Sequence, residues 1–263
     1  TKPKISILGA EVAGTVAAVG DDVSRFAPGD RVYGDISEAG FGGFAEYVCV
    51  RPDALHPMPS GMSFEQAAAL PHAALLALQG LVDVGALRSN EQVLVNGAGG
   101  GVGAIAVQIA KASGCEVTGV DRASKLDALS AMGFDHVIDY QQIDFTAAGK
   151  RYDLILDTKT TRSPLRYLRA LKAGGRYVTV GGALPRLLQL LFLGRIIRRF
   201  TGKRLAILGL KTNQGLERID EMFASGSLGT FLDSGSYSLA DVPRAMERFG
   251  AAEHVGKVVI KVA

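Results

Sequence analysis

The stretch Glu91–Ile109 reads EQVLVNGAGGGVGAIAVQI, an apolar run followed by a glycine cluster and then by apolar residues at helical spacing. The run Val93–Val95 is typical of a strand buried in a parallel sheet. Five glycines between Gly97 and Gly103 allow a tight turn, and they let the backbone approach a diphosphate without Cβ clashes. The sequence therefore predicts a strand, a phosphate-binding turn and a helix whose N-terminal amides face an anion.

The glycine cluster fits the dinucleotide-binding pattern G-x-G-x-x-G with one substitution, because Ala98 replaces the first glycine ahead of Gly100 and Gly103. It can also be read as G-x-x-G-x-x-G from Gly97, and the alternative interpretation is a glycine-rich turn without a ligand. A second expected strand, 116–120, supports the first interpretation. That strand ends in Asp121, 18 positions after Gly103, close to the roughly 20 expected for a ribose-binding acid.

The composition is that of an ordinary globular protein, with 263 residues of which 48% are hydrophobic and 21% charged. A net charge of +3 is too small to indicate a nucleic-acid partner by itself. Only Cys49 and Cys115 are present, so we expect no disulfide framework and a cytoplasmic location. Charges at Lys2, Lys4 and Glu11 interrupt any signal-peptide core, and no apolar run is long enough to cross a bilayer.

Two patterns of secondary structure divide the chain. Residues 1 to about 60 predict short strands in a small β-rich region. The expected strands there are 14–20, 30–34 and 44–50. From Ser63, which forms a predicted capping box with Gln66, the pattern becomes helical and breaks at Pro71. Beyond the glycine turn, strands alternate with helices, which implies right-handed crossovers and a doubly wound parallel sheet. The expected strands are 136–139, 154–157, 177–180, 205–210 and 257–262, and the expected helices are 124–132, 163–172, 214–225 and 241–249.

Residues 185–204, PRLLQLLFLGRIIRRFTGKR, combine a leucine-rich helical pattern with six basic residues and no acidic ones. Such a helix can lie on an anionic membrane surface. Alternatively, its apolar face covers the sheet or part of a cleft while its arginines extend into water, and we favour this second interpretation. A membrane-surface or RNA adaptor would act through Arg186, Arg195, Arg198, Arg199, Lys203 and Arg204.

Several segments of the chain resemble the medium-chain dehydrogenase/reductase superfamily, and they follow one another in the same order as in that family. The resemblance is to the zinc-independent quinone oxidoreductase branch, which includes zeta-crystallin. The segments are Gly9–Val16, Arg25–Gly34, Gly43–Tyr47, Val93–Gly103, Asp135–Tyr140 and Gly256–Ile260. The resemblance covers essentially the whole chain. It implies an α/β fold in which a Rossmann dinucleotide-binding domain at 76–212 lies between two parts of a GroES-like β-rich catalytic lobe, 1–75 and 213–263.

The chain departs from the family in three respects. Ala10 stands where zinc-dependent relatives carry a histidine, and two cysteines with four scattered histidines do not supply a zinc ligand set, so we expect no metal. Relatives usually carry a further segment before the point where this chain begins at Thr1, so we expect a fragment with an N-terminally incomplete lobe. Leu76 replaces a threonine that many relatives have near the cofactor.

The resemblance implies an NAD(P)H-dependent oxidoreductase that transfers a hydride to a quinone, an enone or a related carbonyl compound. It also implies a homodimer joined through the edge strand 205–210, and no nucleic-acid partner or integral membrane segment is expected. An electrophilic acceptor needs no metal, because the incoming charge spreads onto its oxygen. The catalytic proton donor stays unknown, since Tyr33 and Tyr47 are more typical of packing residues. The alternative function is a fragment that binds cofactor without turnover.

The choice between NADH and NADPH is contested. Asp121 favours NADH, because a carboxylate beside the ribose repels a 2′-phosphate. Arg122, Lys125 and Tyr140 favour NADPH, and the last two fall where zeta-crystallin-like reductases hold the 2′-phosphate. The alternative for Lys125 is a solvated helix residue. We favour NADPH and expect activity with either cofactor. The expected cofactor-binding residues are Ala98, Gly99, Gly100, Gly101, Val102, Gly103, Asp121, Arg122, Lys125, Tyr140, Gly181 and Gly182.

Overall fold

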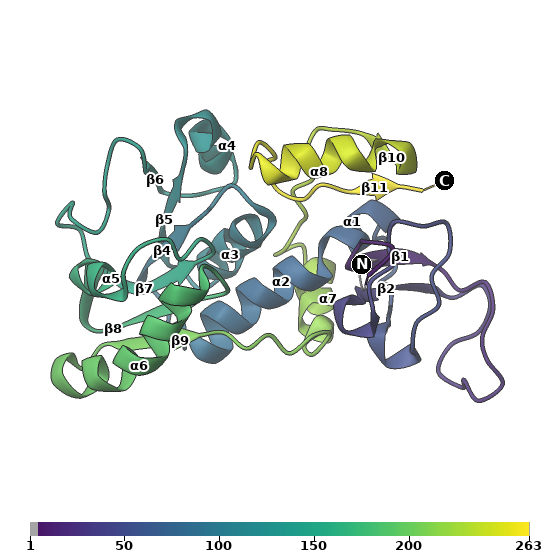
Figure 1. Cartoon of the computed structure of the whole chain (residues 1–263), viewed down its shortest axis with the longest axis horizontal. Coiled ribbons are helices and arrows are strands. Elements are labelled where there is room, and N and C mark those ends of the chain that lie inside the picture. The colour runs from purple at the N-terminus through teal and green to yellow at the C-terminus, as the bar shows by residue number, and fades with distance from the viewer. Residues whose placement is uncertain (1–4, 263) are drawn as a thin grey trace. The chain divides into compact units, whose positions relative to one another are not determined.

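A computed structural model describes residues 5–262 of the chain (Figure 1). The described residues form two compact units. The Rossmann unit comprises Leu76–Leu210 together with Ser227–Gly229. The terminal unit comprises the residues up to Leu75, Lys211–Gly226 and the residues from Thr230 onward. The Rossmann unit contains one sheet and the terminal unit contains two.

The Rossmann unit is built on a six-stranded parallel sheet in the order β6-β5-β4-β7-β8-β9. The strands are β4 Gln92–Asn96, β5 Glu116–Asp121, β6 His136–Asp139, β7 Tyr152–Asp157, β8 Leu171–Thr179 and β9 Arg204–Ile207. The order reverses at β4, with β5 and β6 on one side of it and β7, β8 and β9 on the other. Such a reversal leaves a crevice outside the carboxyl ends of the strands, where doubly wound proteins bind nucleotides. The predicted doubly wound parallel sheet is confirmed.

The two central strands of this sheet, β4 and β7, are apolar on both faces. Val93, Leu94 and Val95 in β4 are all fully buried, as are Leu154, Ile155 and Leu156 in β7. Successive residues of a strand point to opposite faces, so the sheet is covered on both sides. This explains why the strand segments read as continuous apolar runs rather than as alternating patterns.

The helices of the Rossmann unit follow the expected alternation closely. They are the π-helical η3 Gln79–Val84, α3 Gly101–Ala112, η4 Ala123–Lys125, α4 Leu126–Ala131, α5 Pro164–Ala170 and α6 Leu184–Thr201. Helix α2 Pro71–Leu78 precedes them, and the boundary between the two units falls within it, after Leu75. Helix α3 buries Ile105, Ala106, Ile109 and Ala110 as its spacing predicted, whereas Val102, the first residue of the same apolar series, is only half-buried. The short π-helical turn η3 was not predicted, because its sequence carries no signal that separates it from α-helix.

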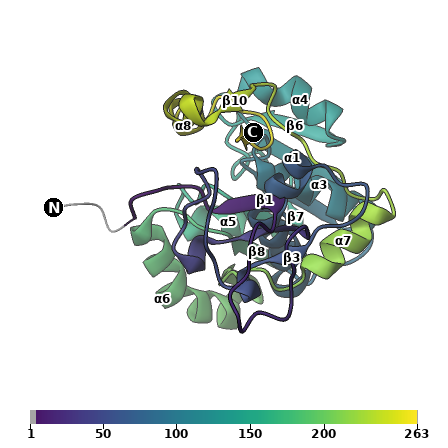
Figure 2. The ribbon, with the colours of Figure 1, turned by 90° about the vertical axis from the view of Figure 1, so that its right-hand side faces the viewer.

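The terminal unit contains two small sheets. Strands β1 Glu11–Thr15, β2 Arg31–Asp35 and β3 His56–Pro57 are antiparallel, whereas β10 Tyr237–Ser238 and β11 Ile260–Lys261 are parallel. Its helices are η1 Ser37–Ala39, η2 Pro52–Ala54, α1 Phe64–Ala69, α7 Leu216–Ala224, η5 Leu239–Asp241 and α8 Val242–Gly250. Helix α1 packs against β1 (Figure 2). The predicted capping box is present, since Ser63 and Gln66 exchange hydrogen bonds at the start of α1.

Three strand predictions in the terminal unit are wrong in extent. The expected strand 44–50 forms no ladder with any described residue, although Phe44 N donates a hydrogen bond to Leu8 O at 2.9 Å. The observed strand β1 covers Glu11–Thr15, so it overlaps the expected strand 14–20 only at the first two residues of that expected strand. Of the expected strand 257–262, only Ile260–Lys261 form a strand, β11. Alternating apolar residues favour an extended chain, but a strand also needs a neighbour that pairs with its backbone.

Candidate functional site

The glycine turn after β4 is shaped so that only glycine fits at two of its positions. Gly97 has φ +82°, and a Cβ there would lie 2.1 Å from Thr158 Oγ1. A Cβ on Gly103 would lie 2.2 Å from the carbonyl oxygen of Ala98. The first glycine permits the turn, and the second lets α3 pack closely against the end of the strand.

The start of α3 is open to an anion. Gly100 is the N-cap, and no side chain caps the helix. The amides of Gly101, Val102 and Gly103 have no intrahelical acceptor, because they belong to the first turn. A Cβ on Gly100 would meet only the Gly97 carbonyl oxygen, at 3.8 Å, so the space beside this residue is open. Free amides, a helix dipole and missing side chains fit a diphosphate.

Asp121 closes the turn from the end of β5. Its side chain is 8% exposed, and Oδ2 accepts a hydrogen bond from Gly99 N at 2.8 Å. Oδ1 accepts one from Arg122 N at 2.9 Å. Sequence reasoning assigned Asp121 only to the ribose and missed this support of the glycine turn. A carboxylate oxygen accepts more than one hydrogen bond, so the bonds leave capacity for a ribose hydroxyl.

The residues predicted to recognise a 2′-phosphate lie near Asp121. Lys125 in η4 is only 4% exposed, so the interpretation of it as a solvated helix residue is wrong. A Cβ on Gly99 would lie 2.6 Å from Lys125 Cδ, so the lysine stem covers the glycine turn. Tyr140 follows β6, has an exposed ring and donates its backbone N–H to Asp121 O at 3.1 Å. Arg122 directly follows Asp121, so all three cluster at the carboxyl end of β5.

The predicted glycine pair Gly181 and Gly182 follows β8 at the same edge of the sheet. Thr160 Oγ1 donates to Gly181 O at 2.5 Å, and Thr179 Oγ1 donates to the same carbonyl at 2.7 Å. A Cβ on Gly182 would lie 2.3 Å from Thr160 Cβ. The structure therefore joins the segment after β8 to the segment after β7 through a close backbone approach.

Asp157 is a buried carboxylate that sequence reasoning did not identify. Its Oδ1 accepts hydrogen bonds from Asn96 Nδ2 at 2.8 Å, from Lys159 N at 2.9 Å and from Thr160 N at 3.0 Å. Its Oδ2 accepts from Tyr177 Oη at 2.7 Å. Burial, together with the charge of Asp157, raises the pKa of Tyr177. The only sequence signal was an acidic residue at the end of the apolar run LILD. Asp157 thereby ties the ends of β4, β7 and β8 together beside the glycine turn.

The terminal unit contains a cavity of about 290 Å³. Its apolar wall includes Phe44, Met246 and Phe249, and its polar wall includes Glu11, His72 and Lys257. Lys257 forms an ion pair with Glu11. Ala10, at the position where a histidine would mark a zinc site, also lines this cavity. Across residues 5–262, no three His, Cys, Asp or Glu side chains are grouped so as to hold a metal ion.

The two tyrosines considered as proton donors do not line this cavity. Tyr33 is fully buried and donates a hydrogen bond to Asp220 Oδ1 at 2.5 Å. Burial and this bond to Asp220 raise the pKa of Tyr33. Tyr47 is 79% exposed. The burial of Tyr33 agrees with the interpretation of it as a packing residue, whereas the exposure of Tyr47 does not.

His72 and Asp35 form a hydrogen-bonded pair in the terminal unit, with His72 Nδ1 2.6 Å from Asp35 Oδ2. The Asp35 side chain is completely buried, and Ser37 N donates to its Oδ1 at 2.9 Å. Burial opposes ionisation of Asp35, but the hydrogen bonds from His72 and Ser37 outweigh it and hold the pKa of this carboxyl below its usual value. Asp35 therefore stays ionised beside the imidazole.

We expect His72→Leu to destabilise the protein by about 1–3 kcal/mol at neutral pH, because it leaves the buried Asp35 carboxylate without its main partner. The folded pKa of Asp35 lies below its unfolded value of about 3.9, so this stabilisation exists above that pH and disappears as pH falls through the folded value. Urea unfolding from neutral to acid pH should show the difference between wild type and variant shrinking. A difference that stays constant with pH would contradict this assignment.

The exposed pair His136–Glu116 offers a matched control. Hydrogen bonds from Lys150 and His136 lower the pKa of Glu116 to about 2. The pair is solvent-exposed, and exposed ion pairs contribute less than about 1 kcal/mol. His136→Leu should therefore destabilise the protein less than His72→Leu does.

Comparisons with known proteins agree with this architecture. Residues 132–260 match the family described as zinc-binding dehydrogenase, and residues 1–60 match the alcohol dehydrogenase GroES-like domain. The chain is 34% identical to the polyketide synthase GfsB of Streptomyces halstedii over 99% of its own length, but it spans only 5% of that protein. It is 30% identical to 2-methylene-furan-3-one reductase of Solanum lycopersicum, covering 98% of this chain and 64% of the relative.

A solved structure supports the same relationship. The quinone oxidoreductase of Coxiella burnetii superposes with a TM-score of 0.83 and 28% identity, over 97% of this chain and 79% of the other. None of the helices within residues 5–262 is both long and apolar enough to span a membrane.

Proposed function

Because this chain belongs to the medium-chain dehydrogenase/reductase superfamily, we propose that it is an NAD(P)H-dependent reductase of conjugated carbonyl compounds or quinones that works without zinc. The observation that carries the proposal is the open N-terminus of α3 behind a turn in which Gly97 and Gly103 leave no room for a Cβ. The bound nicotinamide cofactor supplies the hydride. The chain spans only a small part of its polyketide synthase relatives, so its activity as a reductase is part of this proposal.

The proposed cofactor site uses the residues at the carboxyl ends of four strands. The amides of Gly101, Val102 and Gly103 donate to the diphosphate, and Asp121 accepts from a ribose hydroxyl. Arg122, Lys125 and Tyr140 bind a 2′-phosphate, which favours NADPH. Gly99, Gly100, Gly181 and Gly182 keep the backbone close to the cofactor without side chains in the way, and Ala98 adds only a buried methyl group to the same turn.

The proposed acceptor is an enone or a quinone. The names of a relative and of a solved structure refer to a methylene-furanone and to quinones, and both kinds of compound spread an added negative charge onto oxygen. Such an acceptor needs no metal to activate it, which suits a chain that has Ala10 where zinc-dependent relatives carry a histidine. The aromatic and apolar wall formed by Phe44, Met246 and Phe249 suits a flat apolar compound.

Lys125→Met tests the cofactor preference. Methionine keeps the length and most of the apolar stem over Gly99, but it removes the charge that would face a 2′-phosphate. We expect the dissociation constant of NADPH to rise on the order of tenfold, as for the loss of one charge-assisted hydrogen bond, and that of NADH to change less than about twofold. Fluorescence titrations of both cofactors measure this. Equal weakening of both would show that Lys125 supports the turn rather than the phosphate.

A cofactor titration followed by a screen of quinones and enones tests the function itself. We expect saturable binding of NADPH and NADH and oxidation of the reduced cofactor in the presence of at least one conjugated acceptor. Binding without turnover on the whole panel would favour the alternative, a cofactor-binding chain without catalysis. No binding of either cofactor would exclude both.

The edge of the Rossmann sheet offers a surface for a homodimer. Strand β9 lies at the edge of the described sheet and pairs with β8. We propose a cytoplasmic homodimer joined through this edge, and light scattering after gel filtration tests the dimer.

A further inference from the structure

The charge of the chain is distributed very unevenly. Residues 158–210, all in the Rossmann unit, contain twelve basic residues and no acidic one, whereas the whole chain has a net charge of +3. The remaining residues carry 17 basic and 26 acidic side chains, a net charge of −9. A single-sign region of this size attracts anionic partners. Helix α6 lies within this region.

Helix α6 is apolar on two faces. Leu190 and Ile197 are buried on the side that packs along β9. The other face is formed by large apolar residues that are exposed and recur at helical spacing. They are Leu184, Leu188, Leu191, Phe192, Ile196 and Phe200. Phe192 is 75% exposed and Phe200 is 80% exposed. The favoured interpretation, in which the apolar face covers the sheet, therefore accounts for only part of this helix.

The arginines beside this outward face have no internal partners. In the described part of the chain, the side chains of Arg195, Arg198 and Arg199 on α6 and of Arg204 on β9 make no ion pair or hydrogen bond, although their backbone groups take part in the helix and the sheet. Arg176, on the strand next to β9, is by contrast bound to Glu91 at 2.5 Å and to Gly85 O at 2.7 Å.

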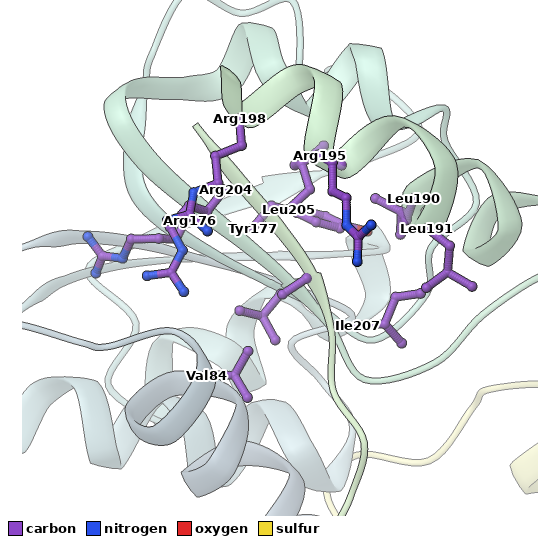
Figure 3. A pocket seen from close by; sticks show the side chains of 13 residues that line it. Val84, Arg176, Tyr177, Leu190, Leu191, Arg195, Arg198, Arg204, Leu205 and Ile207 are labelled. Carbon is purple, nitrogen blue, oxygen red and sulfur yellow. The ribbon is translucent and has the colours of Figure 1, made fainter. Parts of the chain in front are cut away.

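A hollow of about 240 Å³ lies between α6 and β9. Arg195 and Arg198 reach from α6 toward the strand that carries Arg204 (Figure 3). Leu190, Leu191 and Ile207 form its apolar wall. Unpaired guanidinium groups above an apolar wall match a phosphate that is joined to a hydrocarbon chain.

We propose that α6 docks the protein on the surface of a bilayer that contains anionic phospholipid. The exposed leucines and phenylalanines enter the boundary between headgroups and acyl chains, and the arginines bind headgroup phosphates. The helix lies on the membrane and does not cross it. The charge of residues 158–210 attracts such a surface. RNA would use the cations but not the exposed leucines and isoleucine.

Vesicle flotation with the wild-type chain is the first test. We expect binding to vesicles of phosphatidylcholine with phosphatidylglycerol, weak binding to phosphatidylcholine alone, and release as salt is raised. Equal binding to both vesicles, or none to either, would overturn the proposal. Salt-sensitive binding to RNA in place of the anionic vesicles would overturn it too.

A tryptophan reporter tests which surface enters the lipid. The chain has no tryptophan, so Phe192→Trp gives a single emission signal on α6. Its emission should shift to shorter wavelength with the anionic vesicles. Tyr47→Trp, at another highly exposed position, is the matched control and should not shift. A shift in the control alone, or in neither variant, would contradict docking through α6.

Two triple variants test whether membrane binding depends on the arginines of α6 and β9. Arg195→Gln, Arg198→Gln and Arg204→Gln combined should weaken binding to the anionic vesicles on the order of 100-fold, because each surface cation contributes substantially. Arg51→Gln, Arg244→Gln and Lys261→Gln combined remove the same charge from exposed side chains of the terminal unit and should have little effect. If both triple variants lost the same affinity for the vesicles, the net charge of the protein would explain the binding, and the assignment to α6 would be overturned. Cofactor titration checks that both triple variants remain folded, and the proposal does not depend on catalysis.

Discussion

Gly100→Asp is expected to abolish binding of NADPH and NADH while the protein keeps its fold. Gly100 is the N-cap of α3 with φ −92° and ψ 176°, an extended conformation that aspartate adopts readily. A Cβ there meets nothing closer than 3.8 Å, and aspartate is a favoured N-cap residue. The variant should therefore be as stable as the wild type or slightly more stable.

The same carboxylate occupies the place of the diphosphate. Two unit charges about 4 Å apart repel by roughly 4 kcal/mol at an effective dielectric near 20, so the affinity should fall about a thousandfold. Fluorescence titration measures the affinity, and thermal unfolding measures the stability. Gly100→Asn is the control, because it caps the helix without a charge and should lose less affinity. An unchanged affinity in Gly100→Asp would contradict a diphosphate site at this turn.

Asp157→Leu is expected to cause the largest loss of stability. Leucine matches the size of aspartate roughly but leaves the donors of Asn96, Thr160 and Tyr177 buried without their acceptor. Each buried donor that loses its partner costs about 1–3 kcal/mol, so for these three donors we expect a loss of roughly 3–9 kcal/mol. Urea unfolding at neutral pH measures it.

Asp157→Asn is the matched control for this carboxylate. Its amide oxygen still accepts the hydrogen bonds from Asn96, Lys159 and Thr160, and its amide nitrogen donates to the tyrosine hydroxyl instead of accepting from it. The loss should be clearly smaller than in Asp157→Leu. Similar losses in the two variants would show that the negative charge, rather than the set of hydrogen bonds, stabilises these strand ends.

The parts of the fold that the sequence predicted are those that local pattern determines. The β4 run, the glycine turn and the spacing along α3 are contiguous, and each obeys a steric or periodic rule that a single segment reveals. The capping box of Ser63 and Gln66 is a similar case. The expected strand 44–50 has a good local pattern, but its pairing depends on residues elsewhere, which no single segment reveals.

The candidate site shows the same division. The sequence predicted Asp121 and the glycines from spacing alone. It did not predict that Asp121 binds Gly99 N, nor that Asp157 gathers donors from three strand ends, because these contacts join residues far apart in the chain. Lys125 was open to two interpretations, and burial, which depends on tertiary packing, rejected the solvated one. The exposed apolar face of α6 belonged to the less favoured of two interpretations, because periodicity does not show how many sides of a helix find a neighbour.

The hydrogen bond from Gly99 to Asp121 limits how cofactor preference can be redesigned. Replacing Asp121 would remove a repulsive charge, but it would also release the loop amide that the carboxylate anchors. Selectivity and turn geometry therefore share one side chain and cannot be altered independently there. An engineer seeking strict dependence on one coenzyme should keep Asp121 and vary Arg122, Lys125 and Tyr140, where a change of charge leaves that anchor in place.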